Sequence, residues 1–386
     1  MPWSGSVSKG VGMAGVYIHI PFCRQLCHYC DFYKTVSLAW KGKMTDCLCR
    51  ELILQREYLD QPVETIYFGG GTPTVMAPGQ LKGLLHTVQD IFKGTGKQEI
   101  TVEANPEDMD RGICESLLHA GFNRISIGIQ SFHEADLTLM NRRHTVEQSI
   151  YSVLNAQDAG FDNISVDLIY GLPGMTTDTW KRNVETALSL NVQHISSYYL
   201  TIEKGTIFYR WMKKGILQEQ DDNEGFRQFR VMNRLAASAG FLHYEISNYA
   251  LPGFQSRHNS AYWKGVPYLG IGPSANSFNG KERQWNVSHH AKYIRAIEQG
   301  IIPAEKEELT EKMLFNEAVM TGLRTSGGVD MEEICMRFGY DARQHCLKQA
   351  GKYLKNGWMI KRGGKLILTE EGMFLSDTVI SDLFRE

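Results

Sequence analysis

Short apolar runs alternate with longer amphipathic stretches through the first 200 residues. The runs are rich in β-branched and aromatic residues, which favour strands, and the stretches repeat with helical spacing. Strands are predicted at residues 15–20, 65–68, 99–103, 124–129, 163–169 and 194–200. Helices are predicted between them at residues 47–59, 81–92, 112–120, 146–160 and 178–190. Strands joined through helices of this length pair in parallel by right-handed crossovers.

Six such units predict an α/β fold, either a partial (β/α)6 parallel barrel or an open doubly wound sheet. In both architectures the ligand site lies at the C-terminal ends of the strands. Polar and glycine-rich residues collect at these ends. They include a cysteine-rich loop, the segment GGGTPT at residues 69–74, Glu103, Asn105 and Gln130, while Asp167 falls within the fifth strand. We therefore predict one active site on this rim.

The later part of the chain has a different pattern. Helices are predicted at residues 219–240, 289–299 and 310–323, and a strand at 242–246, whereas residues 247–278 read as a polar, aromatic-rich segment. Two short strands joined across Gly363 and Gly364 predict a hairpin after several helices, which is typical of a winged-helix module. The predicted domains are a disordered lead-in at 1–14, the barrel at 15–245, a connecting region at 246–304 and a C-terminal winged-helix-like domain at 305–386.

Charge argues against nucleic-acid binding. The chain has 41 Lys or Arg residues and 43 Asp or Glu residues, for a net charge of −2, so it has no global positive field. The C-terminal residues 341–386 carry eight Lys or Arg residues against six Asp or Glu residues, too small a surplus for a phosphate-binding face. We predict a packing or partner-docking role for that module and no nucleic-acid partner.

Cysteine use predicts a reducing compartment. Three of the 8 cysteines share one loop, and the others are scattered through helix-like segments, unlike a disulfide framework. No apolar run is long enough for a transmembrane helix, and the first residues have no apolar core that would indicate a signal peptide. We therefore predict a cytoplasmic protein.

The loop after the first strand carries Cys23, Cys27 and Cys30 with the spacing C-x3-C-x2-C. Three thiolates can hold three irons of a cubane cluster and leave the fourth iron open to a small molecule, whereas an electron-transfer cluster usually has four cysteine ligands. A structural zinc site closed by His28, or three inert thiols, is the alternative.

Several motifs accompany this loop: YIHIPF before it, and GGGTPT, VEANP, RISIGIQSF, NRRHT and DLIYGLPG after it. The loop with GGGTPT resembles the radical S-adenosylmethionine (SAM) superfamily. The full set is similar to the oxygen-independent coproporphyrinogen III oxidase-like family and extends over nearly the whole chain. The resemblance implies a [4Fe–4S] cluster held by the three cysteines and exchangeable SAM bound at its open iron.

Two departures select a branch of that family. Phe32 stands where the oxidases tend to carry a further cysteine, and only 22 residues precede Cys23, fewer than in those enzymes. Residues 258–263 read H-N-x-x-Y-W, which resembles the HemW haem-chaperone branch. The resemblance implies a protein that binds haem and transfers it to an acceptor. Decarboxylation of coproporphyrinogen III in porphyrin biosynthesis is the alternative, and an iron–sulfur electron carrier without SAM is a third hypothesis.

The glycine-rich turn and the third strand are predicted to contact SAM. Gly70 and Gly71 let the backbone approach the methionine moiety closely. Thr72 adds a hydroxyl contact. Glu103 can accept hydrogen bonds from the ribose hydroxyls or from the ammonium group. A plain strand-to-helix turn and a solvated strand end are the alternatives for these residues.

Further contacts to SAM are predicted from the other strands. Gln130 and Arg142 would meet the ribose and the carboxylate, with Arg142 preferred to Arg143 for its spacing to the following histidine. Asp167 lies deep in an apolar run, where a carboxylate needs partners. Tyr17 could face the same pocket or pack in the core.

His258 is the candidate haem ligand. We expect it to be exposed, with Tyr262 and Trp263 covering the macrocycle and Arg257 facing a propionate. The alternatives are a histidine that hydrogen-bonds a loop or one that caps a second adenosyl ligand. Beyond haem, the predicted partner is a haem-acceptor protein of unspecified identity, with a peripheral membrane encounter during delivery.

Overall fold

The computed structural model describes residues 13–385, so the predicted lead-in at 1–14 lies almost entirely outside the described residues. Six parallel strands form the centre of its main sheet, in the order β1 to β6. They are β1 (Ala14–Ile20), β2 (Val63–Gly70), β3 (Glu99–Ala104), β4 (Arg124–Gln130), β5 (Ile164–Tyr170) and β6 (His194–Tyr199). The prediction of an α/β fold with a partial parallel barrel is confirmed.

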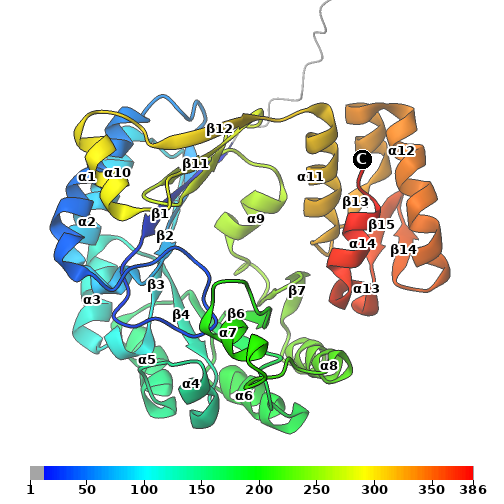
Figure 1. Cartoon of the computed structure of the whole chain (residues 1–386), viewed down its shortest axis with the longest axis horizontal. Helices are drawn as coiled ribbons and strands as arrows, with labels where there is room; N and C mark the ends of the chain where they lie inside the picture. Colours follow the sequence, from blue (N-terminus) through cyan, green and yellow to red (C-terminus); the bar gives the residue numbers. More distant parts are fainter. Residues whose placement is uncertain (1–12, 386) are drawn as a thin grey trace, which may run out of the picture.

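Helices cover the outer face of these strands, and the sheet curves around the opposite face (Figure 1). The covering helices are α1 (Lys41–Leu54), α2 (Pro78–Ile91), α3 (Arg111–Ala120), α5 (Val146–Ala159) and α6 (Thr177–Ser189). Helix α1 begins earlier than the helix predicted at residues 47–59. The short helices α4 (Glu134–Leu139) and α7 (Ile207–Lys213) were not predicted, because each is too brief to show a repeating apolar face.

The sheet extends beyond both ends of the parallel core, to 12 strands among the described residues. Strand β8 (Asn248–Ala250) pairs antiparallel with β6, and β7 (Leu242–Glu245) pairs antiparallel with β8. Helix α8 (Asp222–Ser238) precedes β7 in the chain. Next to β1 lie β9 (Tyr268–Ile271), which is parallel to it, then β10 (Asn276–Phe278), β11 (Glu282–Asn286) and β12 (Ala304–Glu308), with α10 (His290–Glu298) between the last two. The segment expected to connect two domains therefore adds strands to the sheet. The domain boundaries themselves remain predictions.

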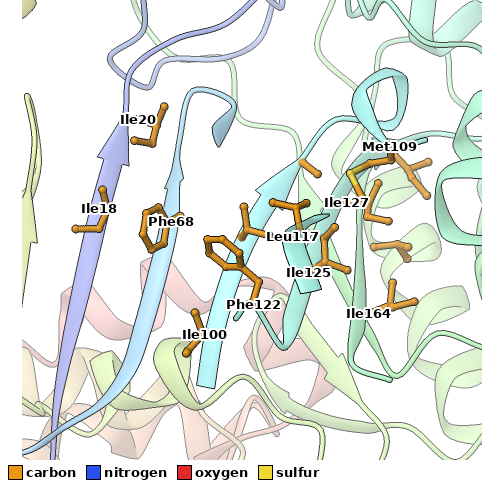
Figure 2. Close-up of a cluster of buried hydrophobic side chains, with 14 of the residues drawn as sticks. Ile18, Ile20, Phe68, Ile100, Met109, Leu117, Phe122, Ile125, Ile127 and Ile164 are labelled. Carbon is orange, nitrogen blue, oxygen red and sulfur yellow. The ribbon is translucent and has the colours of Figure 1, made fainter. Parts of the chain in front are cut away.

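Alternation along the strands separates an apolar outer face from a polar inner face. On β1, Val16, Ile18 and Ile20 are fully buried against the helices, and the residues between them point inward. Figure 2 shows this apolar layer continuing through Phe68 and Ile125, with side chains of α3 packed on it. Burying each such side chain contributes about 1.5–3 kcal/mol. The inner face is thereby left for polar chemistry.

The C-terminal segment forms a module with its own apolar core, which includes Phe315, Val319 and Leu366. Its elements are α11 (Glu311–Leu323), β13 (Val329–Asp330), α12 (Met331–Lys355), β14 (Met359–Arg362), β15 (Lys365–Leu368), α13 (Glu370–Phe374) and α14 (Ser376–Asp382). The predicted hairpin joins β14 and β15, and Gly363 and Gly364 at its turn have φ of 55° and 79°. These positive values are those that a tight hairpin turn requires.

The module packs beside the open side of the barrel (Figure 1). Phe374 contacts the rings of Phe226 and Phe229 on α8 and of Tyr199 at the end of β6. The helix α9 (Arg257–Trp263) lies between the sheet and α11, in contact with β1, β2 and α11. Among the described residues, we find no helix with the length and apolarity needed to cross a membrane.

Candidate functional site

The cysteine loop leaves the C-terminal end of β1 and is closed at its base by backbone hydrogen bonds. The amide of Cys23 donates to the carbonyl of Thr35 at 3.0 Å, and the amide of Thr35 donates to the carbonyl of Pro21 at 2.7 Å. Cys23 is buried, whereas Cys27 and Cys30 are half-buried. The loop is thus held in place by its own backbone, which leaves the three thiols available as ligands.

His28, the alternative considered as a zinc ligand, contacts α4 and α7. Its Nδ1 lies 2.9 Å from the carbonyl oxygen of Leu139 at the end of α4, and its ring packs on Trp211 of α7. Among residues 13–385, no group of three or more His, Cys, Asp or Glu side chains is placed to hold a single metal ion. In a cubane, by contrast, each cysteine binds its own iron.

The thiols are surrounded by hydrogen-bond donors. Thr72 Oγ1 donates to Cys23 Sγ at 3.7 Å, and Nη1 of Arg142 donates to Cys27 Sγ at 3.3 Å. Cys30 accepts from the Phe32 amide and lies beside Lys34. Burial raises the pKa of the Cys23 thiol to about 11 and also raises that of Cys30, so these donors and cations offset the cost of forming thiolates. Donors of this kind fit an anionic cluster.

Arg142 is held firmly beside the loop, while Arg143 is exposed. Nη2 of Arg142 donates to Asn105 Oδ1 and to the carbonyl of Gly128, both at 2.7 Å. Its Nε is buried and has no hydrogen-bond partner among the described residues. One donor of the guanidinium thus remains for a ligand. Asn105 was placed on the rim from the sequence, but no role was assigned to it.

The glycine-rich turn lies directly against the cysteine loop. The amide of Gly71 donates to the carbonyl of Ile20 at 2.8 Å, and the amide of Thr72 donates to that of Phe22 at 2.7 Å. A Cβ at Gly71 would lie 2.7 Å from the Phe22 carbonyl oxygen, and Gly70 has φ of 109°. Glycine is therefore required at both positions by close backbone approach and by conformation.

Glu103 lies on the inner face beside this turn. Its carboxylate accepts from the Tyr67 hydroxyl at 2.8 Å and from the Gly70 amide at 3.1 Å. Burial raises the pKa of Glu103 to about 7, although both hydrogen bonds oppose the shift. Tyr67 was missed in the sequence. Tyr67 lies opposite Tyr17 in the parallel register of β1 and β2. This pairing cannot be read from the pattern of one strand alone.

The other predicted SAM contacts come from neighbouring strands of the same inner face. Tyr17 stacks on Tyr67 with ring centroids 6.0 Å apart and bonds His19 Nδ1 at 3.1 Å. Asp167 accepts from Ser126 Oγ at 3.1 Å, and burial raises its pKa. Gln130 ends β4 with φ of 69°, a conformation that costs about 1–3 kcal/mol outside glycine. Such strain collects at ligand sites.

His258 is buried, so the prediction that it is exposed was wrong. It is 2% exposed, with Nδ1 2.8 Å from Thr65 Oγ1 and Nε2 2.9 Å from the Tyr262 hydroxyl. Burial lowers its pKa to about 3. Glu99 explains this placement, because its carboxylate accepts from the His258 and Arg257 amides at 2.9 Å each and fixes the start of α9 inside the barrel.

Arg257, expected to face a propionate, is instead paired with Glu64 at 3.2 Å. A cavity of about 1700 Å³ lies between α9, the β9–β11 edge of the sheet and the C-terminal module. Its walls include Tyr262, Trp263, Tyr268 and Phe278. Asp31, Phe32 and Tyr33 of the cysteine loop also line this cavity. It exceeds the usual range for small-ligand pockets of about 300–1000 Å³.

A parallel sheet with a three-cysteine loop after its first strand, and polar side chains along its inner face, defines a radical SAM protein. The Radical SAM superfamily model matches residues 17–187, and the HemN C-terminal domain model matches residues 309–375. The superfamily implies a [4Fe–4S] cluster and SAM.

Relatives narrow this assignment. The chain is 33% identical to heme chaperone HemW of Lactococcus lactis over 94% of this chain and 95% of that protein. It is 33% identical to heme chaperone HemW of Bacillus subtilis over 97% of this chain and 100% of that protein. The chain belongs to the HemW family. The structure of coproporphyrinogen III oxidase (HemN) from Escherichia coli superposes with a TM-score of 0.83 at 23% identity, covering 97% of this chain and 90% of that one, which shows the shared fold.

Proposed function

We propose that this protein is a haem chaperone that binds haem and a [4Fe–4S] cluster with exchangeable SAM, and that it transfers haem to an acceptor protein. One observation carries the proposal: the cysteine loop forms part of the wall of a large aromatic cavity. A cluster on the loop and a haem in the cavity would therefore be neighbours. The reduced cluster would supply an electron to SAM or to a neighbouring acceptor.

Cys23, Cys27 and Cys30 would hold the cluster, and the inner face would hold SAM. Gly70, Gly71 and Thr72 would supply backbone and hydroxyl contacts to SAM. The remaining polar contacts to SAM would come from Tyr17, Glu103, Gln130, Arg142 and Asp167. The Arg142 Nε and the Glu103 carboxylate are of opposite charge, which suits the carboxylate and ammonium ends of one amino-acid moiety.

SAM affinity should rise as the pH increases through about 7, because Glu103 must ionise before it can attract the ammonium group. Below that pH the folded protein holds the proton, and binding must release it. Glu103→Gln should weaken SAM binding by about 1.5–3 kcal/mol, the value of a hydrogen bond to a charged group, and flatten the pH profile. Calorimetry on the cluster-loaded protein measures both, and the exposed Glu147→Gln is the control. An unchanged pH profile in Glu103→Gln would remove this role.

Haem would occupy the cavity with Trp263, Tyr268 and Phe278 against the macrocycle. His258 would hold the haem iron through Nε2 only after the Tyr262 hydroxyl leaves that nitrogen, since both ring nitrogens are hydrogen-bonded. The exposed histidine expected from the sequence is thus replaced by one that is covered by a tyrosine.

Haem titration tests this geometry. Tyr262→Phe removes the group that occupies Nε2, so it should retain the histidine-ligated spectrum and bind haem faster. His258→Ala should lose or shift the Soret band, while Trp263→Ala should weaken haem binding by loss of packing against the macrocycle. A Soret band that is the same in His258→Ala and wild type would exclude His258 as the ligand.

Oxidation of coproporphyrinogen III is the competing function. Incubation of the anaerobic, cluster-loaded protein with coproporphyrinogen III and SAM should yield no protoporphyrinogen. Robust turnover would contradict the chaperone proposal, and failure to bind SAM would instead favour a simple electron carrier. We further propose a cytoplasmic site of action, with an acceptor of unspecified identity and a peripheral membrane encounter during delivery.

A further inference from the structure

We infer that Asn105 is a positioning residue for the cluster, because it joins two of the three cysteine ligands through one hydrogen-bonded bridge. The bridge runs from Cys23 Sγ through Thr72, Asn105 and Arg142 to Cys27 Sγ. Its successive donor–acceptor distances are 3.7, 3.1, 2.7 and 3.3 Å. The inference rests on the proposed presence of the cluster.

The direction of every hydrogen bond in the bridge is fixed by Arg142. A guanidinium only donates, so the Asn105 atom that it contacts must be the carbonyl Oδ1. The Asn105 amide nitrogen therefore faces Thr72 and donates to Oγ1. Because Oγ1 accepts that hydrogen bond, the Thr72 hydroxyl hydrogen is free to point to Cys23 Sγ. The orientation of the Asn105 amide thus follows from its neighbours.

Only an amide can perform this task. An aspartate at position 105 would still accept from Arg142, but it would offer a second acceptor to Thr72. The Thr72 hydroxyl would then turn toward residue 105, and Cys23 would lose its donor. Alanine would free Thr72 and leave Nη2 of Arg142 with only the Gly128 carbonyl as its partner.

The bridge should set the reduction potential of the cluster. Reduction adds negative charge to the cluster, and hydrogen bonds to the ligand sulfurs stabilise that charge and raise the potential. Asn105→Asp removes one such donor and adds a negative charge, so both changes lower the potential. Thr72→Val removes the donor alone and should act in the same direction, by a smaller amount.

An EPR-monitored redox titration of the anaerobic, cluster-loaded full chain without SAM tests the inference. At the wild-type midpoint, the ratio of reduced to oxidised cluster should fall about tenfold in Asn105→Asp, the change that about 59 mV produces for one electron. Thr72→Val should lower it less, and Thr72→Ser, which keeps the hydroxyl, should restore the wild-type value. Thr74→Val is the matched control, since Thr74 lies in the same turn and bonds Asp108 at 3.0 Å instead of a sulfur.

Iron and sulfide content, measured before the titration, separates the possible failures. A wild-type protein that holds no cluster would refute the proposed function. Variants that hold the cluster at the potential of Thr74→Val would overturn the bridge alone. If Asn105→Asp does not fold or load, the comparison of Thr72→Val with Thr72→Ser decides, and equal potentials in that pair would overturn the inference.

Discussion

Cys27→Ser should reduce the iron and sulfide bound per chain to background after anaerobic reconstitution. Each cysteine of the loop would hold a separate iron, so the loss of one thiolate leaves two ligands on a cluster that already has an open site. The loop should keep its shape, because it is closed by backbone hydrogen bonds at Cys23 and Thr35. Far-ultraviolet circular dichroism should therefore match the wild type.

The matched control for this prediction is Cys335→Ser. Cys335 is also half-buried, but it lies in α12, far from the loop in sequence and outside the site. It should load a full cluster. A Cys27→Ser protein that retained wild-type iron and sulfide would show that the loop is not the cluster ligand.

Glu51→Ala should lower the free energy of unfolding by about 3–5 kcal/mol, because it leaves several buried donors unpaired. The Glu51 carboxylate is fully buried and accepts from Gln55, Asn286, the Gly272 amide and Tyr293 at 2.5–2.9 Å. These bonds tie α1, which follows the cysteine loop, to the β9–β11 edge and α10. Denaturant unfolding, with the exposed Glu57→Ala as control, measures the loss. A change below about 1 kcal/mol would contradict it.

The same carboxyl group gives stability a pH dependence. Burial raises the pKa of Glu51 from 4.5 to about 7, so the folded state holds its proton more tightly than the unfolded state. The proton-linked part of its contribution to the free energy of unfolding is complete below about pH 4.5 and is lost as the pH rises to about 7. Glu51→Gln, which keeps the shape, should remove this part of the slope between those two values. An equal slope in both proteins would show that another group is responsible.

The fold followed from the sequence where local periodicity decides structure. Strands β1 to β6 could be predicted because each is a short run rich in β-branched and aromatic residues, and GGGTPT marked the turn after β2. The strands β8 to β12 were not recognised as a sheet, since they have only 3–5 residues and include charged runs such as AEKEE in β12. Of these strands, β9 pairs with β1 and β8 pairs with β6, so their places in the sheet depend on residues far away in the sequence.

The functional site likewise combines features that have a local sequence signal with features that depend on long-range contacts. The glycine turn and the three-cysteine loop lie side by side at the strand ends where the sequence placed them, and their role as ligands stays a prediction. His258 was placed in the right neighbourhood but on the surface, because its burial depends on Glu99, more than 150 residues earlier, capping α9. Asn105 received no role because its partners, Thr72 and Arg142, come from two other segments. A local signal did indicate that Asn105 faces inward. It lies two residues after Glu103, and alternate residues of a strand share a face.

Mössbauer spectroscopy of the anaerobically purified, iron-57-labelled protein, with and without SAM, tests the central claim most directly. We expect the spectrum of a [4Fe–4S] cluster in which one iron differs from the other three, and a change at that iron alone when SAM is added. A spectrum of mononuclear iron only, or a cluster whose four irons are all unaffected by SAM, would contradict the account.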